Sequence, residues 1–176
     1  MPEASATLAA WSSFYIMTGS SAAGLTGLMF VVISLVRGWE GPRSSDGIST
    51  FSTPIVMHFF AAFLVSAILC APWHTRILPG ISTALVGIYG VAYVGRVMYR
   101  TRHLSGYTAD LEDWTWYVVL PFVAYGVIAA GAIAFAVVSL KALFAVGGCI
   151  ILLIFIGIRN AWDIVTYLAV RGSGHE

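Results

Sequence analysis

Charged residues are scarce in this 176-residue sequence, because Asp, Glu, Lys and Arg together make up only 10% of it. Soluble domains carry about 25% charged residues, which cover their water-facing surface. Hydrophobic residues make up 59% of the chain, and the mean hydropathy is +0.89. These values exclude a soluble globular domain and a disordered chain, and they favour a protein that is surrounded by lipid.

Other features are missing as well. The net charge is +1, without a basic or acidic run, so we expect no nucleic-acid partner. Two cysteines, Cys70 and Cys149, are too few for a disulfide scaffold, and no His or Cys pair has metal-ligand spacing, so we expect no metal site. Enzyme motifs of the HExxH, Walker, GxSxG and GxGxxG types are absent. We therefore expect no catalytic residue, no cofactor and no enzyme activity, although a bound pigment, quinone or specific lipid stays open.

Long apolar runs dominate what is present. Each run is near or above the roughly 18 residues of a membrane-spanning helix, and lipid requires internal backbone hydrogen bonds. We predict a helix that starts at Thr53-Pro54 and a kink at Pro121. The prediction is a single all-α transmembrane domain over residues 1–176, a bundle of five transmembrane helices. The predicted spans are 11–36, 54–71, 78–99, 114–138 and 142–170.

The distribution of Lys and Arg predicts an orientation. With five spans, the N-terminal side of the membrane holds only Arg76 and Lys141, and the opposite side holds the other seven of the nine cations. Cytoplasmic loops carry an excess of Lys and Arg. We therefore expect the N-terminus outside and the C-terminus in the cytoplasm. A four- or six-span arrangement would break this division.

The first predicted helix contains rows of small residues. Gly19, Ala23 and Gly27 recur every fourth residue, and Ser20 and Gly24 form an adjacent row. Such rows let membrane helices approach closely, either in an assembly or pore seam or in ordinary packing inside one bundle. The candidate packing or pore-lining residues are Thr18, Gly19, Ser20, Ala23, Gly24, Thr26 and Gly27.

A second set of polar residues falls near the predicted cytoplasmic ends of three helices. Arg159 and Asp163 are spaced i,i+4, which allows them to pair on one helix face. Ionisable groups inside a span usually face the bundle interior or a wet cavity, although Arg also extends to lipid head groups. We predict a cytoplasmic polar cluster or vestibule. Its candidate members are His58, Tyr93, Arg96, Arg159, Asn160 and Asp163.

Two stretches carry a family resemblance. They are SSAAGLTGLMFV at 20–31 and GIRNAWD at 157–163. Together they resemble a family of small uncharacterised bacterial inner-membrane proteins, some of which are labelled as modulators of a membrane protease. The resemblance implies a multi-pass fold and location in the bacterial inner membrane, and it supplies no activity.

Two functions compete at this point. The first is a self-assembling channel or carrier for a small solute or ion, in which the first helix lines the path. The second is a non-catalytic accessory or assembly subunit of a larger membrane complex, which docks through the small-residue rows. The expected partners are membrane lipid and either further copies of the chain or other membrane subunits.

Overall fold

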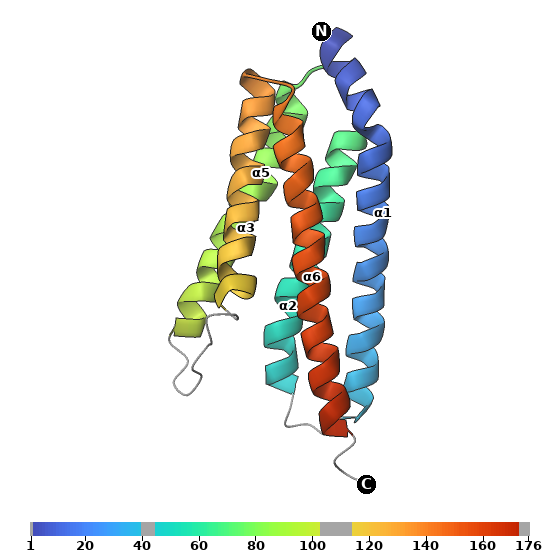
Figure 1. The fold of residues 1–176 in the computed structure, drawn as a ribbon, viewed down its shortest axis with the longest axis vertical. Helices are drawn as coiled ribbons and strands as arrows, with labels where there is room; N and C mark the ends of the chain where they lie inside the picture. Colours follow the sequence, from blue (N-terminus) through green and yellow to red (C-terminus); the bar gives the residue numbers. More distant parts are fainter. Residues whose placement is uncertain (1, 40–44, 103–113, 173–176) are drawn as a thin grey trace.

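The structure, a computed structural model, describes residues 2–39, 45–102 and 114–172, and it contains no strand within those ranges (Figure 1). The described chain is therefore all-helical, as predicted. Its elements are α1 (Pro2–Trp39), α2 (Ser45–Cys70), α3 (Ile77–Arg102), the π-helical segment η1 (Thr115–Val119), α5 (Leu120–Val137) and α6 (Ala142–Gly172).

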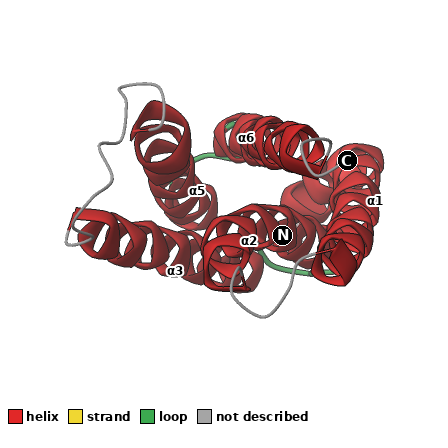
Figure 2. Cartoon of the chain, turned by 90° about the horizontal axis from the view of Figure 1, so that it is seen from below, coloured by secondary structure: helices red, strands yellow, loops and turns green. Residues whose placement is uncertain are grey.

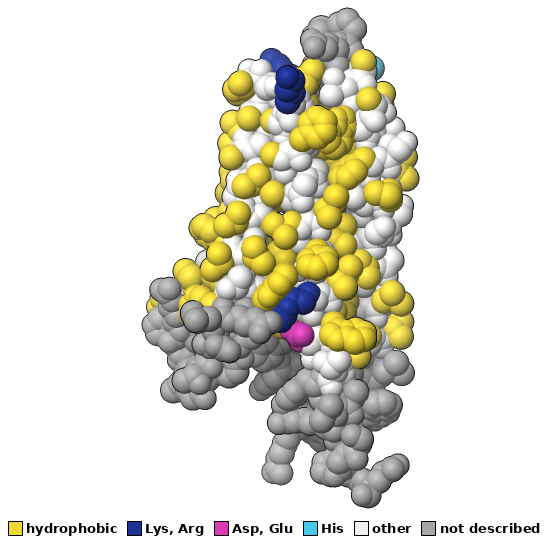
Figure 3. All heavy atoms as spheres, viewed as in Figure 1, with side chains coloured by type: hydrophobic (Ala, Val, Ile, Leu, Met, Phe, Trp, Pro, Cys, Tyr) yellow, Lys and Arg dark blue, Asp and Glu magenta, His cyan; other side chains and the backbone are white. Residues whose placement is uncertain are grey.

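Four of the helical stretches are long and apolar enough to cross a membrane. They are Ser5–Ser34, Ile77–Tyr99, Thr115–Val137 and Ala142–Thr166. The apolar part of α2, Pro54–Cys70, is shorter. Large side chains also point away from the bundle, such as Val138, which is 73% exposed, and Phe144, which is 70% exposed. Hydrophobic side chains dominate the face shown in Figure 3, as expected where lipid replaces water.

The long helices lie roughly along one axis, and each of them runs antiparallel to the one before it in the chain (Figure 1). Viewed along the bundle, α5 and α6 lie on one side, α2 and α3 on the other, and α1 closes one end (Figure 2). The closest helix pairs are α3 with α5, α1 with α2, α5 with α6, and α2 with α6. Contact between α2 and α3 is much less extensive. The bundle therefore has a thinly packed seam between α2 and α3, whereas α3 packs extensively on α5 and α2 packs extensively on α1.

The second helix begins earlier than the sequence predicts. Thr53-Pro54 does not start it, because α2 is already helical from Ser45 and Pro54 lies inside it. Membrane helices tolerate an interior proline when their surroundings satisfy the freed backbone groups. Residues 37–39 likewise continue α1, so the connection between the predicted spans 11–36 and 54–71 is shorter, and its centre, 40–44, lies outside the described residues.

At Pro121, where the sequence predicts a kink, the preceding helix turn is irregular. It lies in the first turn of α5, and η1 directly precedes it. In η1 the backbone N–H of Leu120 donates to the carbonyl of Thr115, five residues earlier. Proline has no N–H to continue the normal ladder. The helix therefore takes up the irregularity as a wide π turn, and Thr115–Val137 remains one span.

Candidate functional site

The small-residue rows of α1 are divided between the bundle and its outside. Gly19 is buried against α2, where an added Cβ would lie 3.0 Å from the Cβ of Ser66. Thr18 is also buried, and its Oγ1 lies 3.0 Å from Ser66 Oγ in a hydrogen bond between the two hydroxyls. These two residues of the predicted set therefore serve ordinary packing between α1 and α2.

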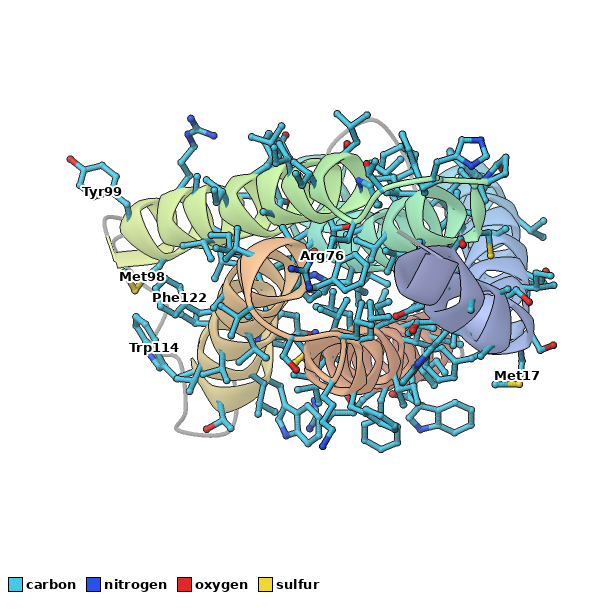
Figure 4. All side chains as sticks on the ribbon, turned by 90° about the horizontal axis from the view of Figure 1, so that it is seen from above. Met17, Arg76, Met98, Tyr99, Trp114 and Phe122 are labelled. Carbon is cyan, nitrogen blue, oxygen red and sulfur yellow. The ribbon has the colours of Figure 1, made fainter. Side chains whose placement is uncertain are left out.

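The rest of the row faces outward. Ser20, Ala23, Gly24 and Gly27 are all exposed, and a Cβ added at Gly24 or Gly27 would meet nothing within 4 Å. Figure 4 shows Met17, one turn earlier, pointing away from the other helices. We name Ser20, Ala23, Gly24 and Gly27 the α1 outer face. It is a shallow strip of small side chains that no described part of this chain covers.

The hydroxyls of α1 have local partners. Ser21 donates to the carbonyl of Met17 at 2.8 Å, and Thr26 donates to the carbonyl of Ala22 at 2.8 Å. Such bonds to the preceding turn satisfy Ser and Thr inside a membrane helix. The hydroxyls of Ser21 and Thr26 therefore need no water-filled path to explain them.

The predicted ion pair of α6 is present. An Arg159 guanidinium nitrogen donates to a carboxylate oxygen of Asp163 one turn later. The two side chains are 25% and 43% exposed, so the pair lies at the edge of the bundle. The guanidinium also lies 4.8 Å from the centre of the Trp116 ring, a cation–π contact that holds it against η1.

His58 is buried in the bundle and pairs with a residue that the sequence analysis missed. Its Nδ1 lies 2.9 Å from the hydroxyl of Tyr125 on α5. The same hydroxyl donates to the backbone carbonyl of Met57 at 3.4 Å. Tyr125 is itself 1% exposed. A tyrosine in the middle of an apolar span could have indicated this polar contact from the sequence, because a buried tyrosine hydroxyl needs a hydrogen-bond partner.

The other predicted members of the polar cluster lie on α6 and α3. Asn160 is fully buried on α6, and neither its Nδ2 nor its Oδ1 has a hydrogen-bond partner in the described part of the chain. Tyr93 and Arg96 are on α3, which packs on α5 and has no extensive contact with α6. Tyr93 lines the same cavity as Tyr125, the partner of His58, so these side chains of α3, α5 and α2 are neighbours.

Two further features to consider are metal-ligating side chains and the two cysteines. Among the described residues, no three His, Cys, Asp or Glu side chains come together as a metal site. Cys70 and Cys149 are both free thiols, and Cys70 Sγ lies 3.8 Å from the carbonyl of Ser12. Comparisons of the chain with protein-family models, curated proteins and solved structures find no match.

Proposed function

We propose that the chain is a self-assembling, non-catalytic membrane protein that packs against a neighbouring copy through the α1 outer face. In the most apolar stretch of α1, 22% of the residues are buried, against 39% in each of the other three long spans. Small residues at a helix surface lose packing contacts with lipid and gain them against another helix backbone. The uncovered strip of Ser20, Ala23, Gly24 and Gly27 is the observation that carries this proposal.

The test is the mass of the purified full chain in mild detergent. Gly24→Leu and Gly27→Leu should shift the protein from an oligomer to a monomer, because the larger side chain holds the second helix away. The monomer accommodates both changes, since nothing lies within 4 Å of either position. Gly148→Leu is the matched control, because Gly148 is an exposed glycine on α6 with the same empty surroundings.

Cysteine cross-linking gives an independent readout. In a chain with Cys70 and Cys149 replaced by serine, a cysteine at Ala23 should form an intermolecular disulfide in membranes, and one at Ala145 on α6 should not. A monomeric native protein would overturn self-assembly. If that monomer co-purified stoichiometrically with other membrane subunits, the α1 outer face would belong to an accessory subunit of a larger complex.

Transport of a small solute or ion is the second candidate, and one observation favours it. The exposed hydroxyl of Ser20 lies on the α1 outer face, where several copies would bring it to a common axis. The local bonds of Ser21 and Thr26 weigh against it, since they remove the polar lining that a path along α1 would use. Proteoliposomes that show flux with the native chain and none with Gly24→Leu would support transport.

The proposal includes five spans, with the N-terminus outside and the C-terminus in the cytoplasm of a bacterial inner membrane. A helix rises 1.5 Å per residue, so α2 extends about 39 Å in all and its apolar part, Pro54–Cys70, about 26 Å, close to a bilayer core of about 30 Å. Arg76 and Lys141 directly precede α3 and α6, whereas Arg96 and Arg159 lie toward the far ends of these two helices, which supports the orientation. Reporter fusions at Lys141 and at the C-terminus should fall on opposite sides, and the same side would refute five spans.

A further inference from the structure

A cavity of about 510 Å³ lies in the thinly packed seam between α2 and α3. Its volume falls in the usual range for small-molecule sites. Tyr125 of α5 contributes to its lining, between the walls that α2 and α3 provide. The residues that matter here are Phe60 and Ala61 on α2, and Tyr89, Gly90 and Tyr93 on α3.

Tyr125 is fixed at the cavity from two sides. A Cβ at Gly90 would lie 2.1 Å from the Tyr125 ring, so only glycine lets the ring lie against the α3 backbone. On the other side, the Tyr125 hydroxyl is held by His58 Nδ1 on α2 at 2.9 Å. The ring therefore bridges from α5, past α3, to α2. A side chain held this way is preorganised, because it has little conformational freedom left to lose on binding.

The polar groups of the cavity are all neutral phenols. Tyr89, Tyr93 and Tyr125 line it together. No carboxylate, ammonium or guanidinium group is among the lining residues. Phenols donate hydrogen bonds to acceptor oxygens, and an uncharged apolar wall excludes ionic head groups. The chemistry therefore selects a neutral ligand with an acceptor oxygen.

We propose that this cavity binds the head group of a neutral, membrane-soluble carbonyl lipid of the isoprenoid quinone class. The Tyr89 phenol would donate to a ring carbonyl beside the fixed Tyr125 ring, and the tail would leave past Phe60, which is 48% exposed on the outside of the bundle. Entry from the side suits a ligand that is dissolved in the bilayer. A phospholipid is a poorer fit, because the lining offers no cation for its phosphate.

The test is thermal denaturation of the purified full chain in detergent with increasing decylubiquinone. A ligand that binds only the folded state raises the transition temperature in a saturable way. Decylbenzene, which has the tail without the carbonyls, and phosphatidylglycerol should give no saturable shift. An equal shift with decylbenzene would overturn recognition of the head group, and a shift with phosphatidylglycerol alone would assign the cavity to phospholipid.

Two variants test whether the quinone binds in this cavity. Ala61→Phe fills the cavity and should abolish the shift, whereas Ala145→Phe, on an exposed part of α6, should leave it unchanged. Tyr89→Phe, at a side chain 55% exposed, keeps the fold and should weaken apparent affinity roughly three- to tenfold, as expected for one hydrogen bond. Native affinity in both Ala61→Phe and Tyr89→Phe would overturn the proposal.

Discussion

Gly87 marks a close approach of the α3 and α5 backbones, and a single methyl group there should separate them. An added Cβ would lie 2.6 Å from the backbone nitrogen of Ala129 and 2.9 Å from its Cα. Ordinary van der Waals contact begins at 3.4 Å. Both neighbouring atoms belong to the backbone of α5, so no side-chain rotation relieves the overlap. The helices must move apart instead.

The size of the effect follows from that displacement. Reaching ordinary contact requires a shift of about 0.8 Å, and gaps of this size forfeit roughly a quarter to a half of each affected dispersion contact. Because α3 and α5 form the most extensive helix pair, many contacts are affected. We expect Gly87→Ala to lower the free energy of unfolding by about 2–3 kcal/mol, the upper part of the range for overpacked cores.

The control is Gly95→Ala on the same helix, where nothing lies within 4 Å of an added Cβ. There alanine should be neutral or should stabilise α3 by up to about 1 kcal/mol, because it favours a helix more than glycine does. Both variants would be unfolded by titrating SDS into mild-detergent micelles while circular dichroism is recorded. Equal stability of the two variants would refute the close approach of α3 and α5 at Gly87.

Three further changes should show how polar groups contribute to stability in the same assay. Tyr125→Phe should cost about 1–3 kcal/mol, because it leaves the buried Nδ1 of His58 without its partner, and a loss below about 0.5 kcal/mol would contradict that pairing. Thr18→Val should cost only about 0.6 kcal/mol, the average for hydrogen bonds between membrane helices, and adding Ser66→Ala should cost little more. Asp163→Asn should cost less than about 1 kcal/mol, because its ion pair is partly exposed, and a larger loss would indicate a buried role for the carboxylate.

The sequence was most informative about features that depend on residues close together along the chain. Apolar length and the shortage of charge predicted the all-helical class, and the i,i+4 spacing predicted the pair of Arg159 and Asp163. The tight connection at 139–141 was also visible, because the apolar run is interrupted there by Ser139 and Lys141. Each of these properties is local: it follows from hydrogen bonding and spacing along one helix, without reference to any other.

Helix starts and irregular turns were less predictable, because the same stretch of sequence is compatible with more than one backbone conformation. Pro54 is favourable at the start of a helix, yet α2 extends nine residues before it, to Ser45. Pro121 interrupts the normal ladder, and η1 takes up the interruption as a wide turn directly before α5. The surroundings that satisfy the freed backbone groups decide between such conformations.

Only the tertiary structure decided which residues meet. In a soluble helix the apolar face indicates the core, but lipid and bundle interior are both apolar, so the pattern says little about how a membrane helix is rotated. Gly19, Gly24 and Gly27 look alike in the sequence, yet Gly19 is buried on Ser66 while the other two are exposed. Likewise, His58 acquires its partner on α5 because Gly90 of a third helix leaves room for the Tyr125 ring. The scarcity of charge determined that this chain is built of apolar helices, and the steric fit of small residues between those helices determined the buried contacts and the surfaces left uncovered.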